Sequence, residues 1–256
     1  MVPRAQTRSL QRGLAALEYV AQAGEASVSE VAAALGLPRP SAHILLSTLA
    51  TAGYLRQARR RGRYRVDLRV LKVAREVLAR LPVRDRAASL LHELAQTTGL
   101  NAYLAVLSRG EAVTVDRVLA QPRPEARADV GVANPAYASA MGKALLAHLP
   151  PAELEAYLAT VDLEPVTEHT ITSVAALRAE LARVRERGYA LSEGEHRSGV
   201  RSVAAPVFAY TGEALAAVCA SHRTPPGEPP PAALIRDVME VAERISHTLG
   251  HGLALE

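Results

Sequence analysis

Four arginines lie close together in the N-terminal third of the chain, and their side chains suit contact with phosphate groups. They are Arg59, Arg60, Arg61 and Arg63. Strand-like segments at Tyr54–Arg56 and Tyr64–Val66 flank them, so the arginines are expected at the tip of a β-hairpin. Guanidinium groups at such a tip can contact the DNA backbone or enter a narrow minor groove. Because they would repel one another without an anionic partner, we prefer this hypothesis to a solvated arginine-rich loop.

A second set of polar side chains lies at and after the start of a short helix expected over residues 40–52, with Pro40 at its first position. It follows a helix over residues 27–35, in which Ser27 and Glu30 can form a capping box, and a tight turn at Gly36-Leu37-Pro38. This order, with a polar and basic start to the second helix, is typical of a helix-turn-helix. The candidate contacts to double-stranded DNA are Arg12, Ser27, Arg39, Ser41, Ala42, His43 and Ser47, together with Arg59, Arg60, Arg61 and Arg63 of the hairpin.

Small polar side chains also recur on two strands expected near the C-terminal end, Val200–Val207 and Ala214–Ser221. Strand alternation places Ser202 on one face of the first strand, and Cys219 and Ser221 on one face of the second. If Ser202 pairs with residue 219 or 221, hydroxyl and thiol groups meet within ~5 Å, whereas a slip of one residue scatters them. Such a cluster suits a small polar or acidic ligand. The alternative is that the hydroxyls only bond neighbouring backbone.

Catalysis is the competing class of function. Ser139 and Lys143 lie four residues apart, and a serine and a lysine on one helix face could act as nucleophile and base. Their spacing differs from the Ser-x-x-Lys motif. The eight histidines show no metal-ligand spacing, and the single cysteine, Cys219, excludes a cysteine-rich metal site. We therefore expect no enzyme, no metal and no cofactor.

Charge is divided unevenly along the 256 residues. Residues 1–80 contain 14 Lys and Arg against 5 Asp and Glu, whereas residues 81–256 contain 16 against 21. A basic N-terminal part joined to a larger acidic part predicts two domains with different partners, the first of them a polyanion. The start of the chain carries Arg4, Arg8 and Arg12 and lacks an apolar signal region, so we expect a cytoplasmic protein with no membrane partner.

The remaining periodicity predicts the elements that position these residues. One amphipathic helix is expected over residues 9–22 and a connecting helix over Leu68–Leu81, which Pro82 ends. The connecting helix has two apolar stripes, more than one neighbour can cover, and this favours packing against a second copy of the chain. Packing of both stripes within one subunit is the alternative.

Beyond Pro82 the pattern mixes helices and strands. The expected helices cover residues 84–98, 140–149, 151–159 and 174–187 and a last amphipathic segment from Ile235 to Leu249; the expected strands cover residues 101–107, 111–118, 200–207 and 214–221. Hairpin-joined strands flanked by helices predict an α+β domain with an antiparallel sheet. The expected division is 1–67 for the DNA-binding domain, 68–82 for the linker helix and 83–256 for the ligand-binding domain.

Several short motifs, in this order and spacing, resemble the isocitrate-lyase-regulator (IclR) family of transcriptional regulators. The motifs are Ser9-Leu10-Gln11-Arg12-Gly13-Leu14, Gly36-Leu37-Pro38-Arg39-Pro40-Ser41-Ala42-His43, Gly53-Tyr54, Ala138-Ser139-Ala140-Met141-Gly142-Lys143-Ala144-Leu145-Leu146-Ala147, Thr170-Ile171-Thr172, Arg187-Gly188-Tyr189-Ala190, Gly199-Val200 and Ala204-Ala205-Pro206. The resemblance runs over nearly the whole chain. It implies a winged helix-turn-helix, a linker helix that dimerises, and a C-terminal domain of GAF-like fold that binds a small-molecule effector.

The resemblance also implies where the effector binds. The corresponding positions are Ala140, Met141, Ser192, Val200, Ser202, Cys219 and Ser221. The family often has an acidic residue at the position of Ser192, and Cys and Ser at those of Ser202 and Cys219, so the identity of the effector does not carry over. At Ile44 the family's frequent Arg or Lys is absent, and an outward isoleucine could contact a thymine methyl group.

The resemblance implies a homodimer or homotetramer, and a dimer would place two recognition helices in successive major grooves of operator DNA. A small organic or aromatic acid in the C-terminal domain would change its affinity for the operator. The alternatives are a hydrolase that uses Ser139 and Lys143, and an architectural DNA-binding protein without a ligand.

Overall fold

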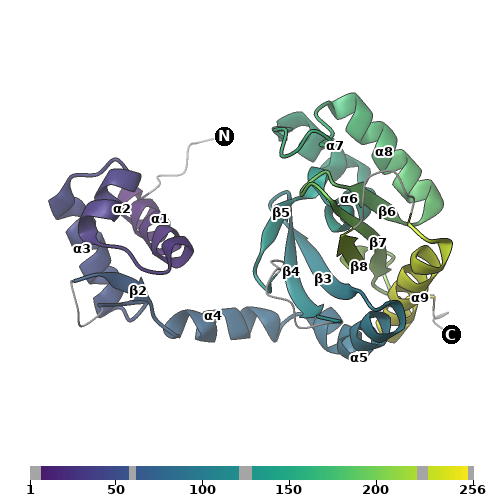
Figure 1. Cartoon of the computed structure of the whole chain (residues 1–256), viewed down its shortest axis with the longest axis horizontal. Coiled ribbons are helices and arrows are strands. Elements are labelled where there is room, and N and C mark those ends of the chain that lie inside the picture. The colour runs from purple at the N-terminus through teal and green to yellow at the C-terminus, as the bar shows by residue number, and fades with distance from the viewer. Residues whose placement is uncertain (1–6, 58–61, 121–128, 224–229, 253–256) are drawn as a thin grey trace. The chain divides into compact units, whose positions relative to one another are not determined.

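The computed structural model describes residues 7–57, 62–120, 129–223 and 230–252. The chain divides into two compact units, Met1–Arg80 and Leu81–Glu256. We describe each unit by itself (Figure 1). The division falls inside the linker expected over residues 68–82, at the junction of two helices.

The N-terminal unit is a winged helix-turn-helix. Its elements are α1 (Arg8–Ala23), α2 (Val28–Ala34), α3 (Arg39–Thr51), β1 (Leu55–Gln57), β2 (Tyr64–Val66) and α4 (Arg69–Leu78). The apolar stripe of each of the first three helices meets in one core, as their periodicity predicts. This core contains Ala16, Val20, Val31, Ala42, Leu46, Leu55 and Tyr64.

The wing is an antiparallel hairpin that is attached to the start of the helix-turn-helix. Within it, Leu55 pairs with Val66 and Gln57 pairs with Tyr64. The backbone of Tyr64 also pairs with Ala26, through N–H to oxygen bonds of 2.9 and 2.7 Å. These two bonds therefore fix the wing against the loop between α1 and α2.

The linker helix α4 is shorter than expected and ends at Leu78. Leu81 has φ −106° and ψ 85°, because a residue that precedes a proline is disfavoured in the helical region. Pro82 then occupies the first turn of the next helix, where its missing N–H costs nothing. The expected helix 68–81 is thus a ten-residue helix followed by a short break.

The C-terminal unit is built on one antiparallel sheet. Among the described residues its strand order is β5-β4-β3-β8-β7-β6. The strands are β3 (Asn101–Ser108), β4 (Glu111–Val118), β5 (Ala133–Pro135), β6 (Ala190–Glu193), β7 (Val200–Phe208) and β8 (Ala214–Arg223). The four strands expected from the sequence are present; β5 and β6 were not expected, because at three and four residues they are too short for an alternating pattern.

Helices cover both faces of this sheet (Figure 1). One face packs against α5 (Pro82–Thr98) and α9 (Ala232–Thr248), and the other against the short 3₁₀ helix η1 (Ala136–Ala138), α6 (Ala140–Leu146), α7 (Pro151–Thr160) and α8 (Val174–Arg187). The α+β architecture is as predicted. Helix α6 ends three residues earlier than the helix expected over 140–149.

Gly142 allows α6 to approach η1 closely. A Cβ atom at Gly142 would lie 2.3 Å from both the Cα atom and the carbonyl oxygen of Ala136. No side chain can occupy that space, and the obstacle is backbone rather than a flexible side chain. The start of α6 can therefore pack this closely against η1 only because residue 142 is a glycine.

We expect Gly142→Ala to destabilise the C-terminal unit by about 3 kcal/mol, since an overpacked methyl group must push two backbone segments apart. Urea unfolding measures this loss. The matched control is Gly13→Ala in α1, whose Cβ atom would meet only Leu45, at 3.9 Å. The control should be neutral or stabilising, because alanine favours a helix by ~0.5–1 kcal/mol over glycine. Unchanged unfolding of Gly142→Ala would refute this account of the packing.

Candidate functional site

The first candidate site is the exposed start of α3. The capping box fixes the helix before it: the Ser27 N–H donates to Glu30 Oε2 at 2.7 Å and the Glu30 N–H donates to Ser27 Oγ at 3.3 Å. These bonds, led by the one from the Ser27 backbone, hold the pKa of Glu30 below its ordinary value. Pro40 lies in the first turn of α3. Local sequence thus sets the start of each of the two helices.

The side chains at the start of α3 divide into exposed and buried sets. Arg39, His43 and Ile44 are exposed, and Ile44 retains 63% of its accessible surface. Ser41 is half-buried, and so is Ser47, whose hydroxyl donates to the Ile44 carbonyl at 3.0 Å. An exposed, mixed basic and apolar surface of this kind can enter a major groove.

Three other predicted contacts, Ala42, Ser27 and Arg12, differ in burial. Ala42 is fully buried in the core of the unit, so its side chain cannot reach DNA and its place among the candidates is corrected. Ser27 is half-buried and its hydroxyl already accepts the capping bond, whereas Arg12 is exposed on α1. The alanine faces inward because it shares the apolar stripe of α3.

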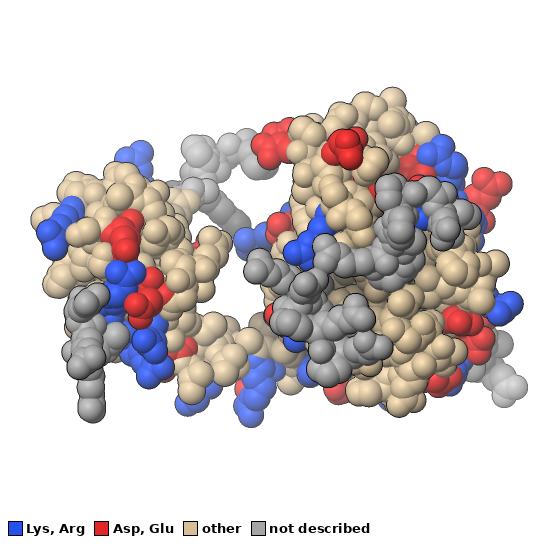
Figure 2. Space-filling view, in the orientation of Figure 1, with Lys and Arg blue, Asp and Glu red and all other residues tan. Residues whose placement is uncertain are grey.

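The arginines of the wing differ in their surroundings. Arg59, Arg60 and Arg61 lie outside the described residues. Arg63 forms ion pairs with Glu25 at 3.0 Å and with Glu30 at 2.8 Å, so its guanidinium joins the wing to the start of α2. On the visible face of this unit, Lys and Arg lie beside Asp and Glu (Figure 2). The expectation that Arg63 points freely from the tip is corrected, because nearby carboxylates hold it.

The second candidate site is a row of small polar residues across the C-terminal sheet. Ser192 of β6 pairs with Ser202 of β7, Ser202 pairs with Ser221 of β8, and Ser221 pairs with Asn101 of β3. Directly paired residues on antiparallel strands project to the same face. The expected register, in which Ser202 pairs with residue 219 or 221, is confirmed.

A second row lies beside the first on the same face. Tyr103 of β3 pairs with Cys219, and Cys219 pairs with Ala204 of β7. Asn101 and Tyr103 were not among the predicted site residues, although their strand was predicted. Nothing local shows that β3 lies next to β8, because the two strands are more than a hundred residues apart in the chain.

Burial sets the chemistry of this face. Burial raises the pKa of the Cys219 thiol to about 12, and it also raises the pKa of Tyr103. Both groups therefore stay neutral at physiological pH. Ser192 is buried as well, and its hydroxyl donates to the Ala138 carbonyl at 3.5 Å. The site offers neutral hydrogen-bonding groups.

Helix α6 covers this face. Ala140 and Met141 are buried in the same core cluster as Cys219. The Ser139 hydroxyl caps the helix by accepting from the Gly142 N–H at 3.1 Å. Val200 is half-buried at the start of β7, two residues from Ser202 and hence on the same face. The predicted effector residues are thus distributed over one face of the sheet and the helix packed upon it.

Lys143 forms a buried ion pair. It is 1% exposed, and its Nζ atom lies 2.5 and 2.7 Å from the two carboxylate oxygens of Glu195, in the loop after β6. Glu180 of α8 lies 4.0 Å away. Burial raises the pKa of Glu195, and the charge of Lys143 opposes that rise. With Lys143 held by Glu195 and the Ser139 hydroxyl used as a helix cap, this pair is not arranged as nucleophile and base.

Among the described residues, no group of three or more His, Cys, Asp and Glu side chains is placed to hold a metal ion. In that same part of the chain, no helix combines the length and apolar character needed to cross a membrane.

Comparisons with known proteins give consistent matches. The family described as "Bacterial transcriptional regulator IclR C-terminal" matches residues 75–247, and the "IclR helix-turn-helix domain" matches residues 9–59. The transcriptional regulator XynR of Escherichia coli is 32% identical over 95% of this chain and 98% of its own length. The transcriptional repressor IclR of E. coli is 32% identical over 84% of this chain and 80% of its own length.

Solved structures agree in fold. An IclR homologue from Microbacterium hydrocarbonoxydans, complexed with 4-hydroxybenzoate, superposes with a TM-score of 0.79 at 25% identity, covering 94% of this chain and 99% of the other. The IclR structure from Thermotoga maritima gives a TM-score of 0.74 at 28% identity, covering 96% and 100%.

We expect Lys143→Met to cost ~3–5 kcal/mol at pH 8, because it leaves Glu195 buried without its partner. Losing Lys143 also removes the charge that opposes the raised pKa of Glu195. A carboxyl group whose folded pKa is raised binds its proton more tightly when folded, so the loss should shrink as the pH falls from 8 to 5.5.

Urea unfolding at the two pH values measures this dependence. The matched control is Arg236→Met on the exposed surface of α9, which should change stability little at either pH. A loss for Lys143→Met that is the same at both pH values would show that Glu195 is not the group left uncompensated.

Proposed function

The chain belongs to the IclR family of transcriptional regulators, which are not enzymes, and on that basis we propose that it binds operator DNA as a dimer under the control of a small organic or aromatic acid. The observation that carries the effector part is the row of Ser192, Ser202 and Ser221 in register beneath α6. A regulator of this kind acts in the compartment that holds the chromosome.

Helix α3 enters the major groove in this proposal. The exposed Arg39 supplies a cation for phosphate or guanine, His43 a hydrogen-bonding ring, and Ile44 a methyl surface for thymine. Ser41, Ser47 and the exposed Arg12 supply further polar contacts. The wing arginines Arg59, Arg60 and Arg61 contact the backbone beside it, while Arg63 positions the wing.

A second copy of the chain covers α4. This helix has no buried residue among those described, and Leu71 and Val77 retain 61% and 58% of their accessible surface. Apolar side chains repeated along one helix at this exposure favour association. A dimer would place two copies of α3 about 10 base pairs apart, or a multiple of that. A tetramer is a pair of such dimers.

The effector contacts Ser192, Ser202, Cys219 and Ser221 on the sheet and Ala140 and Met141 on α6, with Val200 at the edge. Neutral hydroxyl and thiol groups suit the oxygens of a small acid. That a homologue of the same fold was solved with 4-hydroxybenzoate supports an aromatic acid among the candidates. Effector binding would shift the population of dimer geometries, with a coupling of ~1–3 kcal/mol to DNA affinity.

We expect Arg39→Gln to weaken operator binding and to lower the slope of log K against log salt by about 1, since one phosphate or base-edge contact is lost. Fluorescence anisotropy, with a duplex selected by the full chain from a random library, measures both quantities. Arg197→Gln, an exposed arginine of the C-terminal unit, is the control and should leave both unchanged. An equal slope for the two variants would place α3 away from the DNA.

We expect a small organic or aromatic acid, with 4-hydroxybenzoate included in the panel, to raise the melting temperature, because a ligand at 100 times its Kd stabilises the folded state by ~2.7 kcal/mol. Ser202→Leu should abolish that shift by filling the row. The exposed Ser198→Leu should retain it. A shift that persists in Ser202→Leu would move the effector away from this row, and no shift with any acid would argue against acid recognition.

A further inference from the structure

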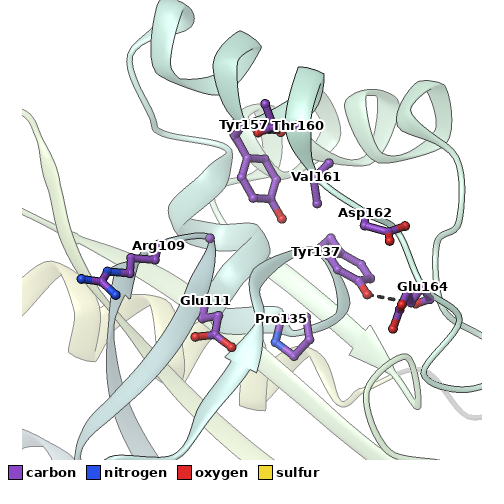
Figure 3. A pocket seen from close by; sticks show the side chains of 10 residues that line it. Arg109, Glu111, Pro135, Tyr137, Tyr157, Thr160, Val161, Asp162 and Glu164 are labelled. Carbon is purple, nitrogen blue, oxygen red and sulfur yellow. Dashed lines mark hydrogen bonds between the residues drawn. The ribbon is translucent and has the colours of Figure 1, made fainter. Parts of the chain in front are cut away.

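A cavity opens at the other end of the C-terminal sheet (Figure 3). It has a volume of about 490 Å³ and is lined by the β3–β4 turn, the β5–η1 junction and the C-terminal end of α7. Asn101 and the Ser221 row lie at the start of β3, whereas this cavity lies at its end. Eight residues of strand separate the two places, a distance of ~27 Å at the usual rise per residue. The cavity is therefore distinct from the candidate effector site.

Negative charge surrounds this cavity. The carboxylates of Glu111, Asp162 and Glu164 lie along it, and none of the three forms an ion pair within the described residues. Arg109 belongs to the same lining, but its side chain extends away from the cavity (Figure 3). Helix α7 ends at Thr160 beside the cavity, and the C-terminal end of a helix adds partial negative charge.

Two tyrosine rings provide the apolar wall. The Tyr137 hydroxyl donates to the Glu164 carbonyl at 2.9 Å. Tyr157 points into the cavity (Figure 3), where its hydroxyl lies beside the Tyr137 backbone and makes no hydrogen bond to another side chain among the described residues. Burial raises the pKa of Tyr157 to about 12, so the hydroxyl is a neutral donor and acceptor. Aromatic faces beside carboxylates attract cations.

The wall is held in place by contacts between distant segments. The Gly110 carbonyl accepts from the Ala136 N–H at 3.0 Å, which joins the β3–β4 turn to η1. Gly110 has φ +81°, and a Cβ atom there would lie 3.1 Å from the Tyr157 ring. The ring thus rests directly on the turn. The turn, η1 and α7 are thus packed against one another at the wall of the cavity.

We propose that this cavity binds an organic cation, namely an ammonium or guanidinium group carried on a short apolar stem. The charged group faces the carboxylates of Glu111, Asp162 and Glu164 and donates to the hydroxyl oxygen of Tyr157, and the stem packs on the tyrosine rings. The same chemistry has two sources: a free amine or guanidine, and a Lys or Arg side chain of a second copy of this chain.

The test uses n-butylguanidinium as the probe and n-butylurea, its uncharged analogue of similar shape, as the ligand control. Saturation-transfer difference NMR on the full chain should show saturable binding of the guanidinium and none of the urea at the same concentrations. No saturation at millimolar guanidinium, or equal binding of the urea, would overturn the proposal.

Variants locate the site. Glu111→Gln combined with Asp162→Asn should weaken guanidinium binding at least about fivefold, the effect expected for the loss of partly exposed ion pairs. Glu153→Gln, an exposed carboxylate in the first turn of the same helix α7, should leave it unchanged. Equal affinity in the double variant and the unchanged chain would place the cation elsewhere and overturn the proposal.

Sedimentation velocity separates the two sources. If the cation is a side chain of a second copy, saturating butylguanidinium lowers the sedimentation coefficient of the full chain by releasing that copy. If it is a free molecule, the coefficient stays the same. Either result supports a cation site, and neither depends on DNA binding or on the acid effector.

Discussion

The antiparallel pairing of β7 with β8 is the constraint on which the ligand-binding side of the molecule depends. In the observed register Ser202 lies opposite Ser221. Val203 and Ala205 alternate with the residues of that face along β7, so they face α9 on the other side of the sheet. A slip of one residue would turn hydroxyl groups into the apolar layer between the sheet and α9 and would cost ~1–3 kcal/mol for each group left unsatisfied. The apolar face therefore enforces the position of the polar one.

The helix that covers the polar face is fixed at two consecutive residues. Gly142 brings α6 against the backbone of Ala136, and Lys143 ties it to Glu195 beyond the end of β6. These contacts fix the distance between the two walls of the candidate effector site, which are Met141 on α6 and Ser192 on β6. A buried ion pair adds little stability over an apolar pair of the same size, but it is costly to break singly, which makes the spacing well defined.

The parts of this architecture that sequence could predict are those that local chemistry decides. The Ser27 cap and the end of the helix expected over residues 174–187 each depend on a few neighbouring residues, and both were predicted. The adjacency of β3 and β8 depends on the whole fold, so the sequence did not predict that Asn101 and Tyr103 belong to the site. The ion pairs of Arg63 and the cavity beside Tyr157 are likewise formed by segments that are distant in the chain. The periodicity of the sequence therefore does not predict them.

The proposed DNA surface is charged and the proposed effector row is neutral, and this difference bears on how the two can be coupled. The DNA side relies on full positive charges, so its affinity depends on salt through counterion release. The effector row relies on hydroxyl and thiol groups that remain neutral, and each such hydrogen bond contributes only ~0.5–1.5 kcal/mol net. Three or four of them, with the burial of a small acid, correspond to a dissociation constant nearer the micromolar than the nanomolar range. Binding of this strength is large enough to change DNA affinity by a coupling free energy of ~1–3 kcal/mol. It is also weak enough for the effector to dissociate readily, as a reversible sensor requires.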